Sequence, residues 1–159
     1  MSYRDRASFG KRQEFAVIAE LLRRGLDVYV TLVDDRQIDC IIRFDDELSP
    51  RYLDVQVKAR SKMCAVRNAA TFSGMGIRSR PNLFFVFYSE HAGCHWVIPS
   101  TDLVRLASRN KSGKHKGKYN ITLTSCRKGQ VCSLPRFQAY VNAFVRLEEA
   151  TSDSVTKPP

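Results

Sequence analysis

Eight consecutive residues near the middle of the chain, Asn82–Ser89 (NLFFVFYS), carry no charge and are mostly large and apolar. A continuous apolar run of this length is typical of a β-strand that is covered on both faces of its sheet. The run therefore predicts a central sheet with further layers on each side.

Five other segments have the alternation or the β-branched composition of strands, and three segments predict helices. The further strands are expected at 28–33, 37–44, 52–59, 95–99 and 119–124, and the helices at 4–24, from Ser100 or Thr101 to 108, and from Pro135 onward. A chain of 159 residues is one ordinary domain by length. We expect a single α/β domain over residues 1–150, with a central mixed β-sheet flanked by helices, and a frayed tail over 151–159.

The first predicted helix, Arg4–Arg24, contains a misplaced carboxylate. The helix is expected to end at Gly25, which tolerates the positive φ of that position. At about 100° per residue the apolar side chains form one arc. That arc consists of Phe15, Val17, Ile18, Leu21 and Leu22. Glu14 projects into its middle, where an unpaired carboxylate is costly. Glu14 is therefore a candidate functional residue, and the alternative is a glutamate at the helix edge that bonds a nearby arginine.

Positive charge is concentrated in the second half of the chain. The net charge is +10, and ten basic residues but no acidic one lie between Leu103 and Leu147. Such a block serves either as a solubility device or as an anion-binding face, with nucleic acid as the candidate partner. The apolar share of 43% and the charged share of 26% are typical of a soluble globular protein.

No segment predicts a membrane span or a secretion signal. The charge-free stretch between Arg80 and Glu90 is too short to cross a bilayer, and the N-terminus lacks an apolar signal region. Five cysteines without a CxxC pair favour a reducing, cytoplasmic location. His91, Cys94 and His95 cluster, but their spacing matches no zinc pattern.

A predicted hairpin brings oxygen-bearing side chains together with a lysine. The two strands on either side of the acidic turn at 45–50 can pair, which places Asp39 close to Gln56 and Lys58 on one face. With Glu14, these residues offer two carboxylates and an amide oxygen, ligands that suit Mg²⁺ or Mn²⁺. Such a metal polarises a phosphoryl oxygen, and the lysine orients or deprotonates a water. The set predicts a site that cleaves phosphodiesters.

Three stretches, in this order, resemble the PD-(D/E)XK nuclease superfamily: GKRQEFAVIAELLRRGLDVYV, QIDCIIRF and YLDVQVKAR. The order of a helix glutamate, a strand aspartate and a strand ending in [E/Q]xK is most similar to the archaeal Holliday-junction-resolvase-like and intron-homing branches. The resemblance covers about residues 10–60. It implies a restriction-endonuclease-like fold and a Mg²⁺-dependent DNA endonuclease that acts as a homodimer or homotetramer.

The resemblance also implies a role for each matching residue. Asp39 is the central metal ligand, Gln56 occupies the second acidic position, and the backbone carbonyl of Val57 reaches the metal. Lys58 activates the water. Glu14 binds or orients a second metal or its waters.

Two positions depart from the family pattern. Ile38 stands where the family name has Pro, and Gln56 stands where it has an acid, which lowers the expected metal affinity. Asp54, on the same strand face, is a candidate for the missing carboxylate. The alternative for Asp54 is an ion pair with a neighbouring arginine.

Basic residues outside the hairpin are the candidates for DNA contacts. They can flank the cleft and hold two stretches of backbone, whereas the alternative for each is a solvated surface residue. The candidates are Arg60, Lys62, Arg78, Arg80, Lys111, Lys114, Lys116 and Lys118. Two rival functions stay open: a nucleic-acid-binding module that keeps the fold without cleaving, and a basic interaction protein with no nucleic-acid role.

Overall fold

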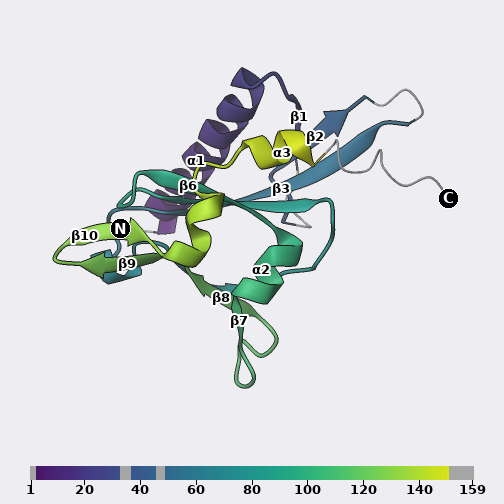
Figure 1. The fold of residues 1–159 in the computed structure, drawn as a ribbon. Helices are drawn as coiled ribbons and strands as arrows, with labels where there is room; N and C mark the ends of the chain where they lie inside the picture. Colours follow the sequence, from purple (N-terminus) through teal and green to yellow (C-terminus); the bar gives the residue numbers. More distant parts are fainter. Residues whose placement is uncertain (1–2, 33–36, 46–48, 151–159) are drawn as a thin grey trace.

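A five-stranded sheet forms the middle layer of the protein (Figure 1). The computed structural model describes residues 3–32, 37–45 and 49–150. In spatial order the sheet contains β1 (Asp27–Val30), β2 (Cys40–Phe44), β3 (Arg51–Arg60), β5 (Leu83–Ser89) and β6 (Cys94–Pro99). Strands β3 and β5 are parallel, and the other neighbours are antiparallel. The predicted mixed α/β class is confirmed.

Different elements cover the two faces of this sheet. On one face lie the helices α1 (Tyr3–Arg23) and α3 (Val145–Glu149). The other face carries α2 (Ser100–Leu106), the 3₁₀ helix η2 (Pro135–Tyr140) and a second sheet of β4 (Thr71–Met75), β8 (Tyr119–Thr122) and β7 (Ser108–Arg109). The remaining elements are the 3₁₀ helix η1 (Val66–Asn68) and the hairpin of β9 (Thr124–Arg127) and β10 (Gln130–Ser133). Among the described residues, no helix is both long and apolar enough to cross a membrane.

Strand β5 contributes to the apolar core on both sides of the sheet. Phe84 and Val86 pack with Leu21 of α1 in one core. Phe85 and Phe87 belong to the other core, beneath the second layer. The prediction that this strand is covered on both faces is therefore confirmed.

Helix α1 ends as the sequence predicts, at a glycine. Gly25 has φ 78°, and its N–H donates to the carbonyl of Leu22 at 2.9 Å. The N–H of Leu26 donates to the carbonyl of Leu21 at 3.2 Å. This pair of bonds is the Schellman motif, which satisfies the last carbonyls of a helix and needs a left-handed residue at C′.

The apolar arc of α1 is narrower than predicted. Val17, Ile18 and Leu21 are buried against the sheet, but Phe15 and Leu22 are 56% and 54% exposed. The sheet contacts a single stripe of the helix, so side chains at the margins of the arc remain in solvent. The prediction is wrong for these two residues.

The predicted continuous C-terminal helix is also wrong. It is divided into η2 and α3, and Asn142 between them has φ 50°. The N–H of Asn142 donates to the His95 carbonyl, and its Oδ1 accepts from the His95 N–H, both at 2.9 Å. Pairing with the start of β6 thus replaces the helical hydrogen bonds at this point.

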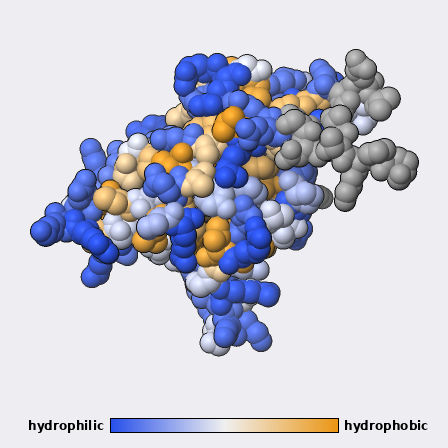
Figure 2. Space-filling view, viewed as in Figure 1, coloured by the Kyte–Doolittle hydropathy of each residue, from blue (hydrophilic) through white to orange (hydrophobic). Residues whose placement is uncertain are grey.

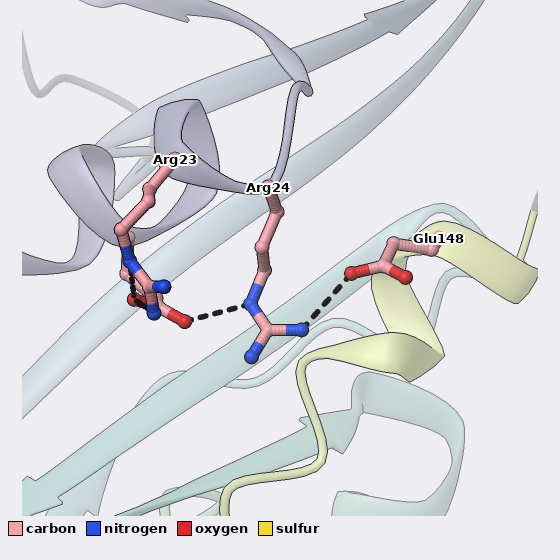
Figure 3. A network of polar contacts seen from close by, with 4 residues as sticks. Arg23, Arg24 and Glu148 are labelled. Atoms are coloured by element: carbon pink, nitrogen blue, oxygen red, sulfur yellow. Dashed lines mark hydrogen bonds and ion pairs between the residues drawn. The ribbon is translucent and has the colours of Figure 1, made fainter.

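A charged network joins the end of α1 to α3 (Figure 3). Arg24 Nε donates to Glu20 at 2.7 Å, and its Nη1 donates to Glu148 at 3.0 Å. The same guanidinium lies over the ring of Phe144, 5.1 Å from its centroid. Hydrogen bonds from Arg23 and Arg24 lower the pKa of Glu20. The network attaches the C-terminal helix to the N-terminal one.

Gly10, within α1, and Gly25, just after it, give opposite predictions for alanine substitution. At Gly25 an added Cβ meets no atom within 4 Å, so Gly25→Ala costs only the positive φ, roughly 1 kcal/mol of unfolding free energy. Gly10 lies within α1, has no positive φ and also has open space, so Gly10→Ala is expected to stabilise by about 0.5–1 kcal/mol. Urea unfolding of both variants tests this, and a shift of the same sign in both would contradict it.

Candidate active site

Asp39 lies immediately before β2, at the point where the pairing of β2 with β3 begins. Its N–H donates to the carbonyl of Val55 at 2.9 Å, and its Oδ2 accepts from the N–H of Val57 at 2.6 Å. Because Cys40 stands opposite Val55, the antiparallel register places Asp39 beside Gln56. The predicted strand 37–44 starts three residues late, since Gln37 has φ 60°. The carboxylate thus acts as a backbone acceptor and is held at one place on the sheet.

Gln56 lies on the face of β3 that points away from α1. It is 2% exposed, and its Nε2 donates to Oε1 of Gln37 at 3.4 Å. Because Nε2 of Gln56 makes this bond, the amide is turned so that its Oε1 does not contact Gln37. Sequence analysis did not identify Gln37, whose only local signal was a polar residue before an apolar strand.

Lys58 shares this face with Gln56, two residues further along β3. It is half-buried and stands opposite Phe87 of the parallel neighbour β5. Within the part of the chain that the structure describes, its Nζ has neither a hydrogen bond nor an ion pair. The ammonium is available to a ligand.

Glu14 approaches from α1, on the other face of the sheet. Its carboxylate is 20% exposed and forms an ion pair with Lys11, one helical turn earlier. Burial, and to a smaller extent the charges of Asp39 and Glu14, raise the pKa of the Cys40 thiol to about 12. Both carboxylates therefore lie close enough to Cys40, at the start of β2, to affect its thiol, although Glu14 comes from α1.

A cavity of about 680 Å³ opens above Gln56. Its floor is formed by β3 and β5, one wall by the segment after β4, and the rim by the loop after β7. The lining residues are Gln37, Gln56, Gly76, Ile77, Arg78, Arg80, Leu83, Phe85 and Gly117. Two of the predicted DNA-contacting residues, Arg78 and Arg80, thus lie in the wall next to Gln56.

Arg80 is held in place by two partners. Its Nη2 lies 3.0 Å from Oδ2 of Asp54, which is buried. Ser100 Oγ accepts the Arg80 N–H at 2.9 Å and donates to the Arg80 carbonyl at 2.7 Å. The carboxylate of Asp54 is therefore used in an ion pair with a neighbouring arginine. The hydroxyl of Ser100, one of the two residues at which this helix was expected to begin, is engaged with Arg80, and α2 has no side-chain cap.

The other predicted DNA-contacting residues lie away from the cavity wall. Arg60 Nε donates to the Thr71 carbonyl at 2.7 Å, and its guanidinium lies 5.6 Å from the centroid of Phe72. Lys62 is exposed just beyond β3. The four remaining lysines, Lys111, Lys114, Lys116 and Lys118, are exposed in the loop between β7 and β8.

The histidines and cysteines do not assemble a metal site in residues 3–32, 37–45 and 49–150. No group of three His, Cys, Asp or Glu side chains suited to a metal occurs there. His91 Nε2 contacts the carbonyl of Cys64 at 2.9 Å, and the ring of His95 packs between Tyr88 and Phe144. Oxygen donors at Asp39 and Gln56 remain the candidates for binding a cation.

Comparison with solved structures identifies a similar fold. No model of a protein family matches the sequence, and no curated protein is similar to it. The structure of a bacterial homing endonuclease, I-Ssp6803I, matches with a TM-score of 0.57 and 21% sequence identity, over 94% of this chain and 96% of that chain. The two proteins share a fold. The similarity extends over nearly the full length of both, so it includes the sheet, α1 and the second layer.

The bonds between Ser100 and Arg80 predict a measurable loss of stability. Ser100→Ala removes both hydrogen bonds of its hydroxyl. The N–H and the carbonyl of Arg80 then lose this partner, which costs roughly 1–3 kcal/mol of unfolding free energy. Ser73→Ala, at an exposed position of β4, is the control and should change stability by less than about 0.5 kcal/mol. Equal effects of the two variants in urea unfolding would show that the hydroxyl of Ser100 contributes nothing special.

Proposed function

We propose that this protein is an endonuclease that hydrolyses DNA phosphodiester bonds with Mg²⁺ or Mn²⁺, as a divergent member of the PD-(D/E)XK superfamily. One observation carries the proposal: Asp39 Oδ2 accepts the Val57 N–H at 2.6 Å, and this bond holds the carboxylate beside Gln56 and Lys58. The register puts Asp39 opposite Gln56, Lys58 lies two residues further along β3, and Gln56 lines a cavity with two arginines in its wall. The fold shared with a homing endonuclease supports the same function.

The donors in this place fit a hard divalent cation. Asp39 offers a carboxylate, and Gln56 offers Oε1 because its Nε2 is bonded to Gln37. The carbonyl of Val57 is the proposed backbone ligand, and Glu14 is the proposed holder of a second ion or its waters. When bound, the cation supplies Lewis-acid polarisation of the phosphoryl oxygen and lowers the pKa of a water.

Lys58 acts on the attacking water and on the phosphate. Its ammonium has no competing partner in the described residues, so it orients the water and offsets the negative charge that develops on phosphorus-bound oxygens. The water oxygen bonds to phosphorus and gives up one proton to solvent, the bond to the leaving oxygen breaks, and the leaving oxygen takes up a proton from solvent. Arg80, held by Asp54, provides a fixed positive charge in the same cavity.

DNA is the proposed substrate because cations flank the cavity. Arg78 and Arg80 lie in its wall, and the lysine-rich loop between β7 and β8 forms part of its rim through Gly117. Backbone phosphates are the anions that such an arrangement binds. One site acts on one strand, so cutting both strands requires two copies, and we infer a homodimer or homotetramer.

A binding module without cleavage is the second candidate. Gln56 brings no charge to the site, and the carboxylate of Glu14 is already paired with Lys11. Metal affinity rises with the number of charged ligands, so this arrangement favours weak binding of a cation. A protein of this kind would bind DNA through the same cations and leave it intact.

Replacement of the lysine separates these two functions. Lys58→Ala is expected to lower the rate of DNA cleavage by roughly 10²–10³-fold, the usual cost of removing one group that stabilises charge developing in the transition state, and to leave DNA affinity largely unchanged. The assay uses supercoiled, linear and branched DNA with Mg²⁺ or Mn²⁺, and Arg127→Ala on the exposed hairpin serves as the control. Full activity of Lys58→Ala would remove this residue from the mechanism. Tight DNA binding by the unmodified protein without cutting in either metal would favour the binding module.

Calorimetry with Mn²⁺ tests the proposed ligands. Asp39→Asn keeps a side-chain oxygen for the Val57 N–H, so the fold should persist while metal affinity falls by roughly tenfold or more. Gln56→Glu adds a negative charge and should raise the affinity. Unchanged affinity in both variants would place the cation elsewhere.

A further inference from the structure

The segment 109–118, between β7 and β8, is the most strongly charged part of the surface. This segment, here called the basic finger, contains one arginine and four lysines in ten residues and no acidic residue. All five cationic residues are exposed. The finger extends from the body of the protein below β7 and β8 in Figure 1, and the corresponding projection in Figure 2 is hydrophilic.

The finger is an ordered ribbon and not an open loop. The N–H of Asn110 donates to the Lys118 carbonyl, and the N–H of Gly117 donates to the Asn110 carbonyl, both at 2.8 Å. Nearer the tip, the N–H of Lys116 donates to the Gly113 carbonyl at 3.0 Å. Gly113 and Gly117 have φ 74° and 82°, which lets the chain turn back within a few residues.

The root of the finger is attached to the second sheet. The side chain of Asn120 donates from Nδ2 to Oδ1 of Asn110 at 2.7 Å, and its Oδ1 accepts the Gly74 N–H at 2.9 Å. Arg109 Nε donates to the Gly117 carbonyl at 3.2 Å, and its guanidinium lies 5.7 Å from the centroid of Tyr119. These contacts fix the direction in which the finger leaves the protein.

The root of the basic finger also borders the candidate active site. Gly117 lines the same cavity as Gln56 and Arg80. A nucleic acid whose phosphate occupies that cavity therefore extends past the finger. A two-stranded ribbon fits the major groove of B-DNA, which is about 12 Å wide.

We propose that the basic finger enters the major groove of DNA that is bound at the candidate active site. Lys111 and Lys116, which precede and follow Gly113, contact phosphates on the two sides of the groove. Ser112 and Lys114, on either side of Gly113 at the tip, face base edges and supply sequence preference. The proposal rests on the proposed function, because it takes DNA as the substrate.

The charge of the finger is tested through the salt dependence of DNA binding. Lys111→Gln with Lys116→Gln is expected to lower the slope of log K against log salt by about 2, since each phosphate contact contributes about 0.9. Arg127→Gln with Lys128→Gln removes the same charge from the turn of β9 and β10, where both residues are exposed, and should leave the slope nearly unchanged. Equal changes in the two double variants would overturn the proposal, because they would report net charge alone.

The tip is tested separately from the charge. Ser112→Ala with Lys114→Arg keeps the net charge and should change the order of preference among sequences in a randomised DNA library while the salt slope stays the same. Methylation of guanine N7, which lies in the major groove, should interfere with binding of the unmodified protein. Unaltered preference, or interference only at adenine N3 in the minor groove, would overturn the proposal.

The two proposals fail in different ways. If the unmodified protein cuts DNA and the finger variants match it in salt slope and preference, only the role of the finger is wrong. If the unmodified protein does not bind DNA at all, the proposed function and the role of the finger fail together.

Discussion

The two-residue period of strand β3 is the constraint on which the rest of the structure depends. Leu53, Val55 and Val57 face α1 and complete the core on that side of the sheet. Successive side chains of a strand point to opposite faces, so burial of these three residues places the polar ones between them on the other face. A shift of one residue in the pairing with β2 would turn the apolar set toward the cavity and bury Lys58 under the helix. The packing of α1 therefore determines where the candidate chemistry lies.

Placing polar groups at the centre of a sheet has an energetic cost, and the protein offsets it with specific partners. Asp54 is buried but paired with Arg80, whose backbone is bonded on both sides by Ser100. Gln56 is buried but bonded to Gln37. A buried polar group without such partners costs about 1–3 kcal/mol. The partners that stabilise this face also hold an arginine and an amide in fixed positions in the cavity wall, so one set of contacts serves both stability and the proposed binding of phosphate.

Negative charge gathers at the start of β2, and positive charge gathers around the cavity. Asp39 and Glu14 place negative charge at the start of β2, close enough to raise the pKa of the Cys40 thiol. Arg78, Arg80 and the basic finger place positive charge around the opening of the cavity. In the proposed function, a cation bound at Asp39 and an anionic DNA backbone held by the rim would meet near Gln56. The proposed endonuclease function follows from this separation of charge.

Local periodicity determined much of the fold from the sequence alone. The end of α1 at Gly25, the apolar run of β5 and the alternation in β3 depend on neighbouring residues and backbone conformation, and the structure agrees with all three. The candidate residues Asp39, Gln56 and Lys58 were predictable for the same reason, because an antiparallel hairpin joins segments that are close in sequence. Their proximity at the β2–β3 pairing needed no information about distant elements.

Only the tertiary structure decided which distant groups become partners. The exposure of Phe15, the break at Asn142 and the clamp of Ser100 on Arg80 depend on contacts between elements far apart in the chain. Glu14 shows the same limit in part, since its partner Lys11 is a local i,i+3 neighbour but its position near Cys40 of β2 came from packing. The sequence by itself therefore determined which residues are the candidates for the proposed chemistry. The tertiary structure decided which of them lie together, because ion pairs and cavity walls form between elements whose separation no local pattern encodes.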